Sequence, residues 1–181
     1  LGDVYKRQVY NTSAKYISYL LTPATVCLAV PLYEQLELLK KNMVAVVCGI
    51  LSGTLASLCG IFALCTLFGF NHQQYVTMLP KSITTAIGIG ISEELGGIVT
   101  ITVAVIIITG ILGNVIADTV FHIFKIKNPL AKGLALGTAS HAIGTARAIE
   151  MGPVEGAMSS LAVAVAGLLT VIFVSGFAQL I

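Results

Sequence analysis

Long apolar runs separated by short polar connections dominate this chain. Three runs are long enough to cross a membrane as helices: residues 43–70, 98–124 and 156–181. Another run, residues 16–33, carries Pro23 and Pro31, so it predicts either a kinked spanning helix or a broken helix beside a cavity. The long runs lack the two-residue alternation of barrel strands. The pattern therefore predicts an all-α integral membrane protein.

Residues 136–152, LGTASHAIGTARAIEMG, are apolar for much of their length yet carry three ionisable side chains. These are His141, Arg147 and Glu150, set among small and hydroxylated residues. An ionisable group at membrane depth costs about 2.5–3.5 kcal/mol on insertion scales, so such groups usually face a cavity or a partner. We therefore expect this stretch to form the interior of a site.

Two parts of the chain are similar at an offset of 56 residues. When residues 82–97 are shifted onto residues 138–153, five of the sixteen positions are identical, and Ser82 meets Thr138. The apolar runs that precede these segments align more faintly at the same offset. The identical pairs are Ala86/Ala142, Ile87/Ile143, Gly88/Gly144, Glu94/Glu150 and Gly96/Gly152.

The lysines predict how these two units are oriented. Short lysine-bearing connections before the first long run and after the second mark the cytoplasmic side. Residues 80–97 must then begin and end on the outer side as a re-entrant hairpin, and residues 136–152 form one from the inside. With tips near Gly88 and Gly144, the hairpins would meet near the membrane midplane, as in many secondary transporters. In the competing interpretation each segment spans once and the charge rule is broken.

The predicted fold class is accordingly an all-α membrane protein with inverted repeats. Each repeat pairs a transmembrane helix with a broken or re-entrant helical segment. The predicted parts are repeat units at about 43–97 and 99–153 and a final span at 156–181.

Hydroxyls, a histidine and an arginine are the candidates for binding a substrate. A helix that restarts after a break points its free N–H groups at the midplane, which favours an anion. Arg147 adds a cation that can hold a carboxylate with two hydrogen bonds. Alternatively, Arg147 pairs with Glu150 or Glu94, and the hydroxyls bond to their own backbone. The candidate binding residues are Thr84, Thr85, Ser140, His141, Thr145 and Arg147.

Three ionisable residues are candidates for coupling or gating. Glu94 and Glu150 occupy the same repeat position, which makes them the best carboxylates for such a role. His141 titrates near physiological pH and could couple transport to protons, or it could be a neutral hydrogen-bonding group. Lys81 heads the first predicted hairpin and could instead reach back to the membrane interface.

Composition narrows the class of function. Of the 181 residues, 56% are apolar and 10% are charged, whereas soluble domains carry about 25% charge. The net charge of +2 and the lack of a basic patch argue against a nucleic-acid partner. The four cysteines are scattered without metal-type pairing, and motifs typical of enzymes are missing. We expect a protein that is not an enzyme and needs neither a metal nor a cofactor.

The first residues look foreign to the rest of the chain. Residues 1–8, LGDVYKRQ, resemble translated sequencing-adapter read-through. We expect residues 9–181 to form a single membrane domain that has lost part of its N-terminus.

Several motifs resemble the LrgB/CidB family. They cover LTPATVCLAVPLY at 21–33, LPKSITT at 79–85, ISEELGGI at 91–98, IITGILG at 107–113 and, most specifically, AKGLALGTASHAIGTARAIE at 131–150. The resemblance extends over about residues 16–181. Family members often carry a proline where this chain has Ala86, and they are longer at the N-terminus.

This resemblance implies two functional pictures. In one, the protein transports small monocarboxylates of the pyruvate, glycolate and glycerate class. In the other, it is an antiholin-like protein that modulates murein hydrolase activity and cell lysis. The resemblance also implies a multi-pass protein of the bacterial plasma (inner) membrane with a small LrgA/CidA-type partner, and it allows a homo-oligomer. The predicted inverted repeat favours the transporter.

Overall fold

The computed structural model describes residue 30 and residues 33–181, and it contains helices and no strand within them. The expectation of a kinked or broken helix at 16–33 falls almost wholly outside the described residues. The elements are α3 (Leu36–Lys41), α4 (Met43–Leu67), α5 (His72–Met78), α6 (Thr85–Glu94), α7 (Val99–Ile123), α8 (Pro129–Met151), α9 (Pro153–Phe177) and a short 3-10 helix (Ala178–Leu180).

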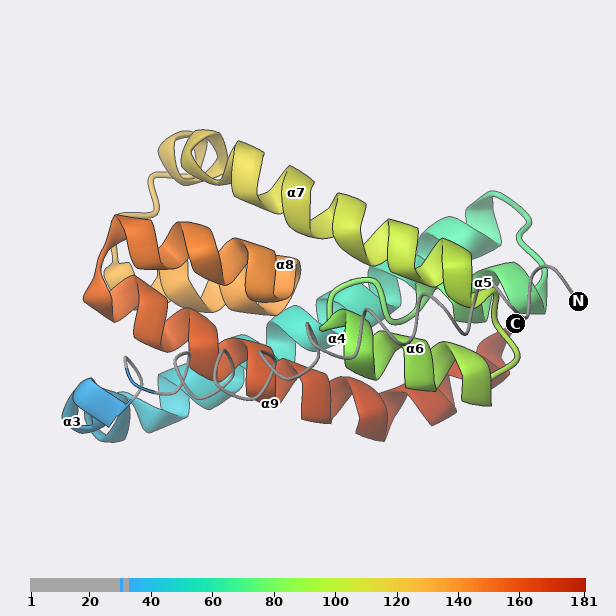
Figure 1. Cartoon of the computed structure of the whole chain (residues 1–181), viewed down its shortest axis with the longest axis horizontal. Coiled ribbons are helices and arrows are strands. Elements are labelled where there is room, and N and C mark those ends of the chain that lie inside the picture. The colour runs from blue at the N-terminus through green and yellow to red at the C-terminus, as the bar shows by residue number, and fades with distance from the viewer. Residues whose placement is uncertain (1–29, 31–32) are drawn as a thin grey trace, which may run out of the picture.

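Three long helices, α4, α7 and α9, form the frame of the molecule (Figure 1). They are long and apolar enough to cross a membrane, which confirms the predicted all-α membrane class. Each has 25 residues and so spans about 37 Å, more than a hydrocarbon core of about 30 Å, which favours tilted helices. Helix α4 ends three residues before the predicted limit because Gly69 adopts a positive φ of 66° and Asn71 caps the next helix.

The first helical hairpin consists of α5 and α6 joined by residues 79–84. Its tip holds Pro80, which has no N–H group to continue α5. The predicted break at Gly88 is wrong, because Gly88 lies inside α6 and donates its N–H to the carbonyl of Thr84. A Cβ at Gly88 would collide with the Ile106 side chain of α7, so this glycine permits close packing. Residues 80–97 thus supply the tip and the second arm, while α5 supplies the first.

The second helical hairpin is α8, whose helical path breaks at His141 (φ 44°, ψ −139°). Residues 129–140 and 142–151 form two arms that fold back on each other (Figure 1). The predicted break at Gly144 is three residues too late. A Cβ at Gly144 would lie 2.6 Å from the Leu136 carbonyl oxygen, so this glycine lets the arms approach instead of bending the chain.

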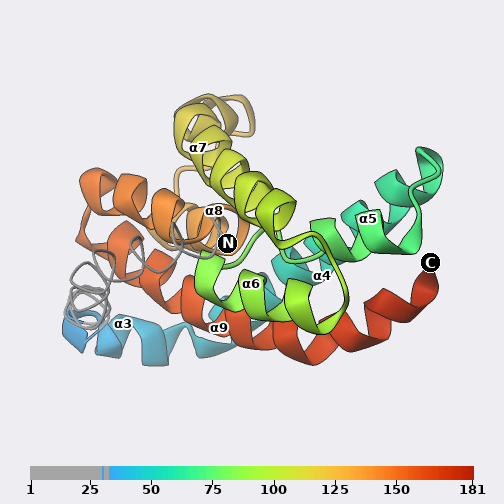
Figure 2. The ribbon, with the colours of Figure 1, turned by 45° about the vertical axis from the view of Figure 1, so that its right-hand side comes forward.

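The two hairpins enter the bundle from opposite ends, and their tips point toward its middle (Figure 1). Helix α9 runs beneath both of them (Figure 2). Helices α4 and α7 run in opposite directions, and their bounds, Met43–Leu67 and Val99–Ile123, differ by 56 residues at both ends. This match agrees with the sequence offset, while the inverted-topology repeat itself stays a prediction.

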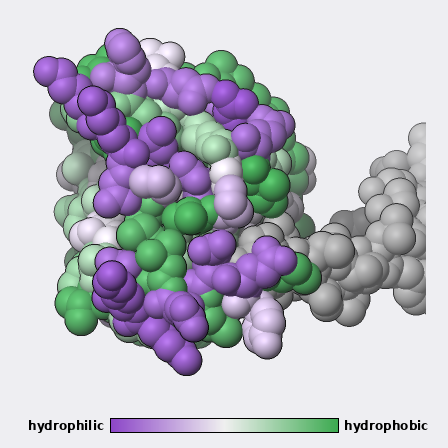
Figure 3. Space-filling model, turned by 90° about the vertical axis from the view of Figure 1, so that its left-hand side faces the viewer, coloured by the Kyte–Doolittle hydropathy of each residue, from purple (hydrophilic) through white to green (hydrophobic). Residues whose placement is uncertain are grey.

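One end of the bundle is covered with hydrophilic residues (Figure 3). Helix α3 and the connection between α7 and α8 lie at this end, and they carry the exposed residues Lys40, Lys41, Lys125 and Lys127. The sides of the spanning helices instead expose large apolar residues, including Val44, Ile108 and Leu168. This distribution suits a bundle that stands across a bilayer with its lysine-rich end in the cytoplasm.

Candidate functional site

A layer of hydroxyl groups separates two apolar cores in the middle of the bundle. Along α4 the buried face reads Val46, Ile50, Thr54, Leu58 and Ile61. Along α9 it reads Ala162, Ala166, Thr170 and Val174. A threonine therefore interrupts each apolar stripe, with one apolar cluster on either side of it.

The hairpin tips meet at this layer around a small cavity of about 10 Å³, close to the room that one water needs. Ser82 comes from the α5–α6 tip and Thr138 from the first arm of α8, near its tip. The other polar residues lining the cavity are Thr54, Ser57 and Thr170. The structure thus brings together Ser82 and Thr138, which the 56-residue offset aligns.

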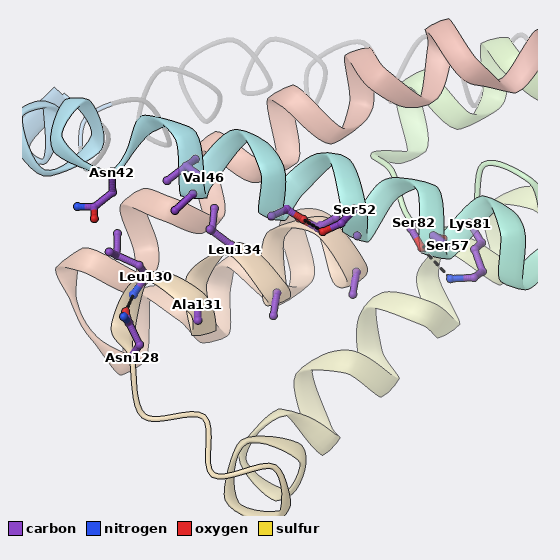
Figure 4. Close-up of a pocket in the computed structure, with 16 residues that line it drawn as sticks. Asn42, Val46, Ser52, Ser57, Lys81, Ser82, Asn128, Leu130, Ala131 and Leu134 are labelled. Atoms are coloured by element: carbon purple, nitrogen blue, oxygen red, sulfur yellow. Dashed lines mark hydrogen bonds between the residues drawn. The ribbon is translucent and has the colours of Figure 1, made fainter.

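A larger cavity of about 700 Å³ leads to the same layer (Figure 4). Asn42 and Asn128 lie at one end, near the lysine-rich face, and Lys81 and Ser82 lie at the other. Small residues of α4 and α8 line its walls: Ala45, Gly49, Ser52, Gly53, Ala131, Ala135 and Ala139. Because most of these residues are exposed, the cavity is an open groove along the side of the described bundle, and it extends from one end of the bundle to the hairpin tips.

Lys81 gives this cavity its charge. Among the described residues that line it, Lys81 alone is ionisable. The half-buried ammonium donates a hydrogen bond to Ser82 Oγ at 2.7 Å, and no carboxylate in the described part of the chain pairs with it. Ser82 Oγ in turn lies 3.1 Å from Ser57 Oγ. An unpaired cation at this depth is costly, so the site favours an anion.

His141, Ser140 and Thr145 lie together on the side of the α8 tip that faces α7 and α9. His141 Nε2 is 2.9 Å from the Ile106 carbonyl oxygen of α7. Thr145 donates to the His141 carbonyl at 3.0 Å and lies 2.9 Å from Ser159 Oγ of α9. These bonds fix the tip to its neighbours, and the three residues lie outside the linings of both cavities.

Arg147 lies near the lysine-rich end of the second arm of α8. It forms ion pairs with Asp118 of α7 and, at 2.7 Å, with Glu150. The Glu150 pairing is one that the sequence suggested, whereas Asp118 was not foreseen. Glu94 lies exposed at the end of α6. The structure therefore places these charged candidates at helix ends, apart from the two cavities.

Thr84 and Thr85 begin α6 and are half-buried. Among the described residues, no side-chain hydrogen bond joins them to α8. Sequence reasoning did not include Lys81, Ser57 or Thr54 among the candidate binding residues; it put Lys81 at the head of the first hairpin, with the membrane interface as the alternative. Two features of the sequence could have indicated these residues. One is Thr54 at the centre of a charge-free span, and the other is the alignment of Ser82 with Thr138.

Comparison with known proteins identifies the family. Residues 4–180 match the LrgB-like family. This chain belongs to the LrgB family. Curated LrgB relatives include the antiholin-like protein LrgB of Bacillus cereus (strain B4264) and that of Bacillus anthracis (strain CDC 684 / NRRL 3495). Each is 42% identical over 168 residues, which are 93% of this chain and 73% of the relative. No solved structure matches this LrgB-family chain significantly.

Membership of the LrgB family and the three apolar helices make this chain a multi-pass membrane protein. The relatives bear the name antiholin-like. The hairpin tips, the lysine and the two cavities add a geometry that the family name does not describe.

Proposed function

We propose that this LrgB-family protein transports small monocarboxylates, with the carboxylate held by Lys81 between the hairpin tips. The observation that carries the proposal is the Lys81 ammonium, which ends a cavity in the middle of the bundle without a carboxylate partner among the described residues. A bound carboxylate would neutralise this charge and remove its desolvation cost. The groove between α4 and α8 extends from Lys81 to the lysine-rich end and gives the anion its access.

The arrangement of the hairpins supports transport over simple binding. Two hairpins that enter from opposite ends and meet at one site can open it to either side by moving in turn. In the described conformation, the larger cavity extends toward the lysine-rich end. With that end in the cytoplasm, this conformation faces inward.

The test is uptake of labelled pyruvate or glycolate by the purified protein in liposomes. Wild-type protein should show saturable uptake, and Lys81→Gln should abolish it, because glutamine keeps hydrogen bonding but loses the charge. Lys127→Gln is the matched control, since Lys127 is an exposed lysine outside the cavity, and it should transport like wild type. Lys81→Arg should retain part of the activity because it keeps the charge.

Two results would overturn the proposal. One is the lack of saturable uptake of any small carboxylate by folded wild-type protein. The other is a Lys81→Gln variant with wild-type half-saturation constant and maximal rate.

A second candidate function is antiholin-like control of cell lysis together with a small LrgA-type membrane partner. The names of the relatives, antiholin-like protein LrgB, favour it. The small residues along α4 and the first arm of α8 also form a surface of the kind that membrane helices pack against. Expression that changes autolysis only when the partner is present, with no carboxylate uptake in liposomes, would support this function.

A further inference from the structure

Two buried hydroxyl groups beside the hairpin tips have no hydrogen-bond partner among the described residues. Thr54 is 3% exposed and Thr138 is 7% exposed, and the Oγ1 atom of each is fully buried without a partner. The other hydroxyls around the same cavity are satisfied. Ser57 and Ser82 lie within hydrogen-bond distance of each other, and Thr170 donates to the Ala166 carbonyl at 2.7 Å. A partner of the two free hydroxyls therefore lies outside the described residues of the chain.

The cavity beside them selects the kind of partner. With room for about one oxygen atom, it can hold a water or one polar atom of a larger ligand. A bare cation is disfavoured, because the cavity has no carboxylate and the Lys81 ammonium bonds to Ser82, one of its walls. Two free hydroxyl donors suit an acceptor oxygen.

The small cavity adjoins the place where the carboxylate is proposed to bind. Ser57, Ser82 and Thr138 line both cavities, and Ser82 receives the hydrogen bond of Lys81. Thr138 therefore borders both the small cavity and the place proposed for the carboxylate. A group on the carbon next to the carboxylate is the part of a small acid that could reach the two free hydroxyls.

We propose that Thr54 and Thr138 determine substrate specificity by donating hydrogen bonds to the oxygen on carbon 2 of a 2-hydroxy or 2-oxo carboxylate. This inference rests on the proposed transport function. A site built to hydrogen-bond such an oxygen rejects the analogue that lacks it, because its own hydroxyls then stay unpaired. Each donor should contribute about tenfold to the preference, the usual effect of one buried hydrogen bond.

The experiment compares two acids that differ in this oxygen, glycolate and acetate, in the liposome assay. Wild type should prefer glycolate in its half-saturation constant. Thr54→Val and Thr138→Val should each reduce the preference about tenfold by weakening glycolate while leaving acetate unchanged. Thr170→Val is the matched control, because Thr170 lines the same cavity but its hydroxyl is already bonded to its own helix. Thr54→Ser, which restores a hydroxyl, should restore the preference.

The possible results separate this inference from the proposed function. If glycolate and acetate weaken equally in both valine variants, or if Thr170→Val behaves like them, the specificity role is wrong and a structural water fills the cavity. If Lys81→Gln has no effect on either acid, the proposed function itself fails. The half-saturation constants do not depend on how much protein folds, so partial misfolding of a variant leaves the comparison valid.

Discussion

The imidazole of His141 spans the gap between the tip of α8 and α7, where its Nε2 lies 2.9 Å from the Ile106 carbonyl oxygen. Opposite the ring, α7 has Gly110, and a Cβ there would lie 2.8 Å from His141 Cε1. The backbone of His141 has φ 44°, a region that costs a non-glycine residue about 1–3 kcal/mol. Contact with α7 therefore holds the break in place.

The strain at His141 can be measured by comparing two variants that both lose the ring. His141→Gly should be more stable than His141→Ala by about 1 kcal/mol, since relief of strain outweighs the extra chain entropy of glycine. Denaturant unfolding in detergent micelles gives the difference. Ala139→Gly, in the regular helix two residues earlier, should instead lose about 0.5–1 kcal/mol. Equal stability of the two His141 variants would contradict a strained tip.

Close contact between α8 and α9 makes a second position, Gly137, sensitive to substitution by a larger residue. A Cβ at Gly137 would collide with the Ser159 carbonyl oxygen and lie 2.7 Å from the Ala162 Cβ. Because both obstacles belong to a rigid helix, Gly137→Ala should destabilise by about 1–3 kcal/mol. Gly60→Ala in α4, where the new methyl meets nothing within 4 Å, should be neutral or stabilise by about 0.5–1 kcal/mol. Thermal unfolding of both variants tests this contrast, and similar melting temperatures would refute it.

Because the two hairpins enter from opposite ends, we predict from which side of the membrane the ends of each hairpin are accessible to a reagent. In a background without the four native cysteines, Gln73→Cys and Glu94→Cys should react with an impermeant thiol reagent from the outside. Lys127→Cys and Glu150→Cys should react only after the membrane is permeabilised. Labelling of Gln73→Cys and Glu94→Cys from different sides would show that α5 and α6 cross the membrane once.

The position of Arg147 predicts that its substitution lowers the stability of the protein and leaves its affinity for substrate unchanged. Its side chain is 32% exposed. Its pair with Asp118 joins the second arm of α8 to α7, and its pair with Glu150 lies within that arm. Arg147→Gln should leave the half-saturation constant for carboxylate unchanged and lower the melting temperature slightly. High salt should shrink that difference, because exposed ion pairs are screened. A large rise in the half-saturation constant would return Arg147 to the binding site.

The unpaired hydroxyl of Thr138 predicts a stabilising substitution in the ligand-free protein. Thr138→Val removes a buried donor that has no partner and should raise the free energy of unfolding by about 1–3 kcal/mol. Thr170→Val should not, because it removes a hydroxyl that is already bonded to the Ala166 carbonyl. Chemical unfolding without substrate compares the two, and equal effects would point to a bound water at Thr138.

The sequence predicted the spanning helices well because length and the lack of charge decide them. Sequence alone did not locate the two breaks. Gly88 and Gly144 looked like hinges, yet both serve close packing, against Ile106 and Leu136 respectively. Contact of His141 with α7 is a tertiary effect that local propensity does not contain.

The candidate site was harder to predict than the fold for a related reason. Lys81 stands next to a proline after a polar loop, a setting that suggests a membrane surface. The fold carries it to the middle of the bundle, because α5 and not residues 80–88 forms the first arm of the hairpin. With the arms placed as the structure has them, the charged residue closest to the tips is Lys81, and Arg147 lies at the far end of its own hairpin.

Lys81 has an unequal counterpart in the other hairpin. The residue 56 positions later is Gly137, whose lack of a side chain is enforced by the Ser159 carbonyl. The charge at the tips of the hairpins therefore comes from one hairpin alone. Under the proposed transport function, the inward-open and outward-open forms would bind the anion with different affinities. Microscopic reversibility would then require a compensating difference in the maximal rates, so transport would be kinetically asymmetric while the equilibrium distribution of the substrate is unchanged.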